Sequence, residues 1–180
     1  MKLIGISGKM GSGKSTLAKH LISKYGDVVV EKVAADLYAI QDYIYNRLEL
    51  KLEGEKDRDL LIAIGEWGRS KSPSLWAAAC FNRISKLQNE VVIVDDIRYP
   101  EEAIAIERLG GLLIRLEGIQ RGPNVDPKSF NRSSETALDS WDFKHRISNL
   151  HSQEETVKQL EKILEEVFNG STSVCSDGRG

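Results

Sequence analysis

The feature that most restricts this chain is a short motif near its start. Residues 8–15 read GKMGSGKS, which fits the pattern Gly-x-x-x-x-Gly-Lys followed by Ser or Thr. An apolar run at residues 3–6 precedes the motif and is typical of a strand buried on both faces. After the motif, Leu17, Leu21 and their neighbours repeat at helical spacing. A strand, a glycine-rich turn and a helix in this order predict an α/β fold.

The glycines of this motif let the backbone curl so that successive N–H groups point inward, and the following helix adds its positive N-terminal end. Such a cradle fits a polyphosphate. The alternative is a glycine-rich turn with an incidental lysine, but such a turn does not require a strand before it and a helix after it. Lys14 can reach the outer phosphates, and the Ser15 hydroxyl is positioned to ligate Mg²⁺. The predicted phosphate site consists of Gly8, Lys9, Gly11, Ser12, Gly13, Lys14, Ser15 and Thr16, with the Lys9 side chain facing solvent.

Strand and helix patterns alternate along the rest of the chain. We expect strands at residues 28–33, 91–94, 112–116 and 145–148, and helices at 35–50, from Ser72, at 100–109 and from Ser152. Ser72 and Pro73 suit a helix start, and Trp76 lies on the apolar face that follows. Residues 48–54 also alternate like a strand, and we interpret them as a helix end and a loop. The pattern predicts a three-layer fold with a central parallel sheet.

The length and the charge balance exclude several classes. A chain of 180 residues suits one domain, and 25 basic against 27 acidic residues give a net charge of −2, with no excess to hold nucleic acid stably. No apolar stretch reaches the roughly 18 residues of a membrane span, and the first apolar run is too short for a secretory signal. With only Cys80 and Cys175, no disulfide scaffold is implied, and we expect a cytoplasmic protein.

Two neighbouring carboxylates, Asp95 and Asp96, follow the apolar run at residues 91–94. We expect them at the carboxyl end of a buried strand, where open parallel sheets bind their ligands. Either aspartate can hold Mg²⁺ there, directly or through water. Aspartates at a strand end are also common in turns, and the glycine-rich motif favours the metal site over that alternative.

Other nucleotide-binding classes lack their signatures in this chain. It has neither the Asn-Lys-x-Asp element of guanine-specific switches nor a Leu-Ser-Gly-Gly-Gln-like string of ABC ATPases. A small-molecule kinase remains, and it needs cations on both phosphate groups, because catalysis consists mainly of positioning and charge neutralisation. We expect the useful arginines outside the regular surface helices, at Arg69, Arg98, Arg121 and Arg132, of which Arg98 lies just past a strand end.

Several blocks occur in a specific order, namely Ala35-Asp36-Leu37, Glu66-Trp67-Gly68-Arg69, Asp96-Ile97-Arg98-Tyr99-Pro100, Leu109-Gly110-Gly111, Ser134-Glu135, and Phe143 with Asn149. In these blocks the chain resembles phage-type deoxynucleoside monophosphate kinases over about residues 1–168. It is more weakly similar to animal phosphomevalonate kinases. The blocks around Arg69 and Arg98 are more specific than the glycine-rich motif, which many families share.

This resemblance implies a nucleoside monophosphate kinase-like fold, ATP with Mg²⁺ as donor, and a deoxynucleoside 5′-monophosphate (dNMP) as acceptor. It implies that Arg69 and Arg98 hold the acceptor phosphate, that Asp36 lies at the acceptor site, and that Arg121 closes from a lid. From its place in the polar loop, we also expect Arg132 to bind the substrate. Lys14, Arg98 and Arg121 would then be the catalytic residues. The chain departs from the family at Leu37, where a proline is frequent, and at Ser133, where a histidine is frequent.

The resulting organisation is one kinase domain at residues 1–168, with an acceptor-binding helical part at about 35–88, a polar lid at about 117–134, and a flexible tail at 169–180. If the chain is phage-encoded, its place is the host cytoplasm. A homodimer is compatible with the sequence, which does not fix the oligomeric state. Two alternatives stay open: a kinase of another phosphorylated metabolite, such as phosphomevalonate, and an ATP-binding regulator that signals through a partner.

Overall fold

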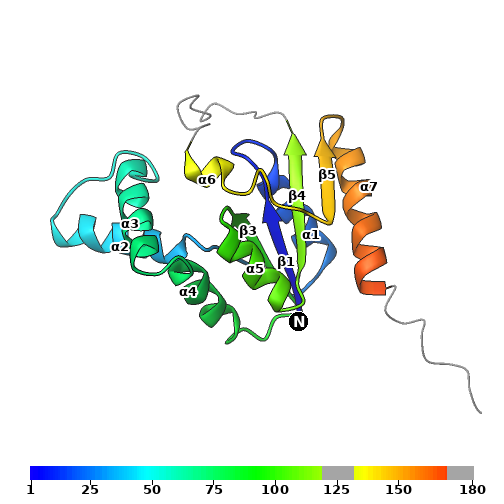
Figure 1. Cartoon of the computed structure of the whole chain (residues 1–180), viewed down its shortest axis with the longest axis horizontal. Helices are drawn as coiled ribbons and strands as arrows, with labels where there is room; N and C mark the ends of the chain where they lie inside the picture. The colour runs from blue at the N-terminus through cyan, green and yellow to red at the C-terminus, as the bar shows by residue number, and fades with distance from the viewer. Residues whose placement is uncertain (119–131, 170–180) are drawn as a thin grey trace, which may run out of the picture.

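The apolar runs of the sequence form the strands of one sheet in a computed structural model, which describes residues 1–118 and 132–169. Within these residues the sheet has five parallel strands in the order β2-β3-β1-β4-β5 (Figure 1). The strands are β1 (Lys2–Ser7), β2 (Val28–Glu31), β3 (Val91–Ile97), β4 (Leu112–Gly118) and β5 (His145–Asn149). The predicted α/β fold class and parallel sheet are therefore confirmed.

Helices connect the strands, as parallel strands require. They are α1 (Lys14–Lys24), α2 (Ala35–Arg47), α3 (Arg58–Lys71), α4 (Leu75–Ile84), α5 (Pro100–Arg108), the short α6 (Ser133–Thr136) and α7 (Gln153–Leu164), which continues as a π-helical segment η2 (Glu165–Asn169). The helix expected from Ser152 is α7, and it begins with a capping box formed by Ser152 and Glu155. Residues 48–54 lie beyond the end of α2 and form a loop rather than a strand, while the helix expected over 35–50 ends at Arg47, three residues earlier than predicted.

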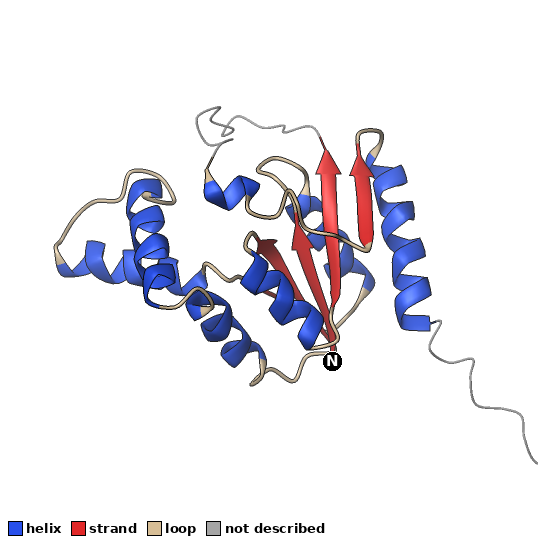
Figure 2. Cartoon of the chain, in the orientation of Figure 1, coloured by secondary structure: helices blue, strands red, loops and turns tan. Residues whose placement is uncertain are grey.

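Helices cover both faces of the sheet (Figure 2). Side chains of the strands alternate between two separate cores, one on each face. Leu3 of β1 packs into the core beneath α4 and α5, and its neighbour Ile4 packs into the core beneath α1 and α7. The same alternation holds for Val92 and Ile93 of β3. A sheet buried on both faces needs apolar residues at every position, which explains the continuous runs in the sequence.

Helices α2, α3 and α4 contact one another in a lobe at one edge of the sheet (Figure 1). Here α3 differs from our expectation, because Arg69 lies in the last turn of a regular helix rather than outside one. Gly65 and Gly68 weaken the helical signal of this segment, but Trp76 of α4 binds the backbone of Gly65 and occupies the space beside Gly68. The Trp76 indole donates a hydrogen bond to the Gly65 carbonyl at 3.0 Å, and its ring lies where a Cβ at residue 68 would be.

This close approach predicts that Gly68→Ala destabilises the protein, although alanine is the better helix former. The helix gains about 1 kcal/mol from the substitution, while overlap with the buried, hydrogen-bonded Trp76 ring costs about 1–3 kcal/mol or more. We expect a lower free energy of unfolding in urea. Gly26→Ala is the matched control, because no atom lies within 4 Å of a Cβ at Gly26. Equal stability of the two variants would contradict the packing argument.

Two expected boundaries are corrected by the structure. Helix α4 starts after Ser74, and Ser72 instead ends α3, so the predicted start at Ser72 is wrong by one short turn. Strand β3 does not stop before the aspartates but runs through them to Ile97. The pairing of β1 with β3 shifts register there, because Gly5 faces Val94 while Ser7 faces Ile97. This irregularity inserts an extra residue beside the glycine-rich loop, as bulges next to active sites do.

Parts of the predicted lid and tail lie outside the described residues, namely 119–131 with Arg121, and 170–180. Of the lid, residues 117–118 end β4, residue 132 precedes α6, and 133–134 are its first residues. No helix in the described ranges is both long enough and apolar enough to cross a membrane.

Candidate active site

The glycine-rich loop connects β1 to α1 and is held in place by a side chain of β5. Gly11 and Gly13 have φ angles of 76° and 100°, in the region that favours glycine. The Asn149 amide donates to the Ser12 carbonyl at 2.8 Å and would lie 2.5 Å from a Cβ at residue 13. Glycine at position 13 is therefore required both by backbone conformation and by this contact. The loop has the shape that a phosphate cradle needs.

The Lys14 ammonium lies inside the loop, where it donates to the Gly8 carbonyl at 2.6 Å and the Lys9 carbonyl at 2.8 Å. Burial, followed by repulsion from Arg98, lowers the pKa of Lys14 to about 8, although Glu135 and Asp95 act in the opposite direction. Lys14 is therefore a partly desolvated cation next to a second cation. A phosphate anion placed between them would relieve this repulsion.

The other polar side chains of the loop and of the first turn of α1 differ in their burial and in their partners. Ser12 is buried, and its hydroxyl has no hydrogen-bond partner among the described residues. Ser15 and Thr16 are exposed in the first turn of α1. Lys9 forms an ion pair with Asp139 at 3.1 Å, so its side chain is held by the protein and does not simply face solvent.

The two neighbouring aspartates of β3 have separate environments. Asp96 accepts hydrogen bonds from the Val33 amide at 2.8 Å and the Ala34 amide at 3.0 Å, and burial raises its pKa. These bonds fix the connection from β2 to α2. Oδ1 of Asp95, by contrast, is buried and has no partner among the described residues. A buried carboxylate oxygen without a partner is unusual and fits a missing cation or water.

Mg²⁺ therefore fits Asp95 better than Asp96, whose oxygens are both engaged. No cluster of three or more His, Cys, Asp and Glu side chains suited to a metal occurs in residues 1–118 and 132–169. A divalent cation here would need oxygens from another source, such as the Ser15 hydroxyl, water and the phosphates of a nucleotide. The donor set is that of a metal–nucleotide site and not of a metal site made by protein alone.

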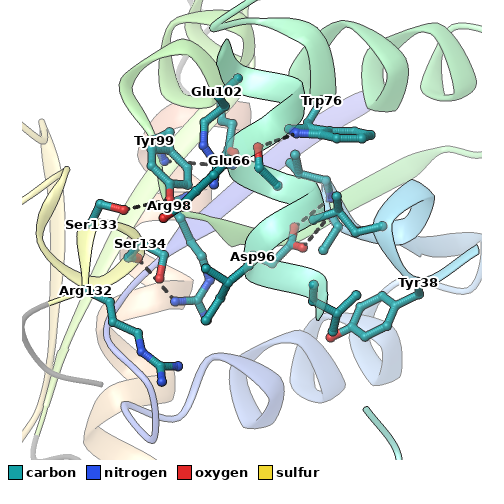
Figure 3. Close-up of a pocket in the computed structure, with 17 residues that line it drawn as sticks. Tyr38, Glu66, Trp76, Asp96, Arg98, Tyr99, Glu102, Arg132, Ser133 and Ser134 are labelled. Atoms are coloured by element: carbon teal, nitrogen blue, oxygen red, sulfur yellow. Dashed lines mark hydrogen bonds between the residues drawn. The ribbon is translucent and has the colours of Figure 1, made fainter. Parts of the chain in front are cut away.

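Next to Asp96 lies a pocket of about 290 Å³ between the helical lobe and the carboxyl ends of the strands (Figure 3). Apolar side chains form much of its wall, namely Val33, Leu37, Leu61, Ile62 and Trp76. Three cationic side chains, Arg69, Arg98 and Arg132, also line it. Three of the four predicted arginines therefore meet at one pocket, although they are far apart in sequence.

Neighbouring side chains hold two of these arginines in place. The Arg69 guanidinium lies over the Tyr99 ring, 4.1 Å from its centroid. Arg98 donates to the Ser134 carbonyl at 3.3 Å and forms an ion pair with Glu135. Figure 3 shows Arg98 and Arg132 near the Ser133–Ser134 segment, whereas Trp76 lies on the opposite side of the pocket. The pocket is thus cationic toward α6 and more apolar away from it.

Asp36 is not brought to this pocket. Its carboxylate forms an ion pair with Arg83, which also pairs with Glu31 at 3.3 Å and donates to the Lys32 carbonyl at 2.7 Å. This network joins the end of β2 to α4. The structure therefore gives Asp36 a role in packing the lobe and does not place it among the residues that line the pocket.

Three buried charged residues at the site were not among the predicted site residues. Glu135 accepts a hydrogen bond from the Met10 amide at 2.8 Å as well as pairing with Arg98. Arg115 of β4 donates to the Ser7 hydroxyl at 3.1 Å and pairs with Asp139 at 2.9 Å. The sequence signal for Arg115 is its position as a charged residue inside an otherwise apolar strand. Glu102, the third, accepts from the Arg98 and Tyr99 amides at 2.7 and 3.1 Å.

Glu102 predicts a pH dependence of stability. Burial raises the pKa of its carboxyl from 4.5 to about 7. Between pH 4.5 and pH 7, Glu102 holds a proton in the folded protein and has released it in the unfolded chain. The stabilisation that this proton gives the folded protein is therefore complete below pH 4.5 and is lost as pH rises through 7. We expect the free energy of unfolding to fall between pH 5 and pH 8 by roughly 1–3 kcal/mol more in the wild type than in Glu102→Gln. Parallel pH profiles of the two proteins in urea titrations would contradict this.

The profile of an AAA domain family matches residues 4–121, which include the glycine-rich loop, both aspartates and Arg98. The chain belongs to this AAA domain family. The match covers most of the chain and begins in β1. Among curated protein sequences, none matches the chain significantly.

Solved structures place this AAA domain chain in a fold shared with several kinases. Shikimate kinase from Acinetobacter baumannii in complex with shikimate has a TM-score of 0.55 at 13% identity, covering 96% of each chain. Shikimate kinase from Aquifex aeolicus has 0.52 at 18%, covering 95% of this chain and 99% of that one. A gluconokinase from Sinorhizobium meliloti has 0.51 at 16%, covering 94% and 97%. At these identities the similarity shows the fold.

Proposed function

We propose that this protein transfers the γ-phosphoryl group of ATP to the 5′-phosphate of a dNMP. The observation that carries the proposal is the pocket next to Asp96, which combines three arginines with an apolar wall and is connected to the glycine-rich loop through Arg98 and Glu135. A nucleoside monophosphate has the matching halves, a dianionic phosphate and an aromatic base whose faces can pack against apolar side chains. The resemblance to phage-type deoxynucleoside monophosphate kinases supports the same acceptor.

The donor side of the reaction belongs to the loop. Its amides and Lys14 bind the phosphates of ATP, while Ser15 and Asp95 hold Mg²⁺, which supplies charge neutralisation when bound with the nucleotide. The unpartnered Oδ1 of Asp95 is the feature of the chain that supports this assignment. Asp96 does not bind the metal in this scheme but fixes the β2–α2 connection.

In this proposal the arginines bind the phosphoryl acceptor. Arg69, Arg98 and Arg132 bind the acceptor phosphate, and Arg98 is the one joined to the loop, through Glu135. Two anions must approach each other for transfer, so cations between them lower the barrier by neutralising charge. An acceptor phosphate oxygen is already largely anionic near neutral pH, because its second pKa is about 6. No strong general base is therefore needed. Arg121 stays a prediction for the same reaction.

The assignment is tested by an ADP-release assay with Mg·ATP and each of the four dNMPs as acceptors. We expect turnover with at least one of them. Shikimate and gluconate are matched acceptors that present a hydroxyl instead of a phosphate, and we expect no turnover with them. ADP release with a hydroxyl acceptor and none with any dNMP, in folded protein, would overturn the proposal.

A second acceptor class is favoured by the position of the arginines. They contact a phosphate and do not select the organic group that carries it, so another phosphorylated metabolite, such as phosphomevalonate, fits the same cations. Adding phosphomevalonate to the assay separates the two proposals. Turnover with it, and none with the four dNMPs, would move the assignment to this class while leaving the roles of Lys14 and Arg98 in place.

A further inference from the structure

Glu135 is the one residue among those described that joins the glycine-rich loop to an arginine of the acceptor pocket through its side chain. Its carboxylate is only 2% exposed, although it belongs to the four-residue helix α6. One oxygen, Oε2, accepts from the Met10 amide at 2.8 Å, and the other, Oε1, pairs with Arg98. One carboxylate oxygen therefore contacts the glycine-rich loop, and the other contacts an arginine of the acceptor pocket.

The surroundings of this carboxylate explain why it can be buried. Burying a charge is costly unless it is paired and hydrogen-bonded. Here the pairing comes from Arg98 and the hydrogen bond from the Met10 amide, and the carboxylate also acts on the charge of Lys14. Arg98 is held a second time by the Ser134 carbonyl, which precedes Glu135 in the chain. The guanidinium is thus fixed from two sides.

We propose that Glu135 is a positioning residue that fixes the Arg98 guanidinium relative to the glycine-rich loop, so that the acceptor phosphate is held in line with the donor phosphates. The role goes through Arg98, and Glu135 itself touches neither substrate. This inference rests on the proposed function for the part played by Arg98. Small errors in the relative placement of reacting groups are costly in phosphoryl transfer, because positioning is a main part of the catalysis.

The test uses Glu135→Gln in the full chain. A glutamine oxygen can still accept from the Met10 amide, whereas its amide nitrogen cannot pair with Arg98. We expect kcat to fall and the KM for the acceptor to rise, about tenfold in kcat/KM together, with ATP affinity at pH 7 changed much less. The matched control is Glu161→Gln, a partly buried glutamate of α7 that pairs with Lys24 and His20 on the far face of the sheet. We expect the control to keep wild-type kinetics.

A double-mutant cycle separates positioning from a merely structural role. In an Arg98→Ala background, adding Glu135→Gln should change kcat/KM by less than about twofold, because the residue through which it acts is gone. Independent, multiplying effects of the two substitutions would overturn the proposal. If Glu135→Gln fails to fold, Glu135→Asp, which keeps the charge but shortens the side chain, replaces it in the same cycle.

A measurement on Arg98 itself keeps the proposal testable if no acceptor is turned over. The order parameter of the Arg98 side chain, measured by NMR relaxation of its Nε–H group, should be lower in Glu135→Gln than in the wild type, because the ion pair is lost. Glu161→Gln should leave it unchanged. No turnover with a lowered order parameter would reject the proposed function and retain the positioning of Arg98. An unchanged order parameter in Glu135→Gln would overturn the proposal itself.

Discussion

Lys14→Ala is expected to lower the rate of phosphoryl transfer by about 10²- to 10³-fold while leaving the fold intact. The reason is the position of the ammonium inside the loop, where it donates to two loop carbonyls and faces a site lined by backbone amides. Removing one preorganised donor of this kind typically costs about 3–4 kcal/mol of transition-state stabilisation. The measurements are kcat/KM for ATP and the free energy of unfolding in urea.

Two further variants make this prediction specific. Lys19→Ala removes an exposed lysine from the same helix and should keep wild-type activity. Lys14→Arg keeps a permanent charge, so it should lack the decline of kcat/KM that we expect in the wild type as pH rises through about 8. A wild-type rate in Lys14→Ala would refute the role given to the loop, and with it the proposed donor site.

Asp95→Asn is expected to abolish the dependence of nucleotide binding on Mg²⁺ without destabilising the protein. The wild type should bind ATP more tightly with Mg²⁺ than without it, and the variant should lose most of this gain, at least about tenfold. Removing the charge of a buried oxygen that has no partner in the described residues should leave the free energy of unfolding unchanged or raise it. Calorimetric titrations of ATP, with and without Mg²⁺, provide the measurement.

Asp96→Asn is the matched comparison and should behave in the opposite way. Asparagine has one acceptor oxygen where Asp96 uses two, so one of the Val33 and Ala34 amides would lose its partner. We expect a loss of about 1–3 kcal/mol in the free energy of unfolding, with the Mg²⁺-dependent gain in ATP affinity retained. If the two variants exchange these properties, the assignment of the metal to Asp95 is wrong.

The sequence was sufficient to place the elements around the glycine-rich loop, because their signals are local. The continuous apolar runs, the capping box of Ser152 and the proline at residue 100 each depend on neighbours within a few positions. The meeting of Arg69, Arg98 and Arg132 at one pocket was inferred from chemistry and a family resemblance, and the structure brings all three to its lining.

What could not be predicted depends on contacts between distant residues. The helical state of α3 is hidden by Gly65 and Gly68, and the small size of Gly68 makes room for Trp76 of the next helix. Asp95 and Asp96 differ because Asp96 accepts hydrogen bonds from the Val33 and Ala34 amides, which lie 63 and 62 positions away in the sequence. Glu135 reaches the Met10 amide across 125 positions of sequence. Secondary-structure propensity and hydrophobic periodicity depend on residues within a few positions, so they do not detect contacts over such separations.

The central position of β1 in the sheet has a consequence for how the protein is made. Of the five strands β1 is synthesised first, but its two partners are β3 and β4, which begin at Val91 and Leu112. The loop that follows it is also braced by Asn149, near the other end of the described chain. Before β4 has been synthesised, β1 lacks a lateral neighbour and the glycine-rich loop lacks its support. We therefore expect nascent chains arrested before β4 to bind no ATP.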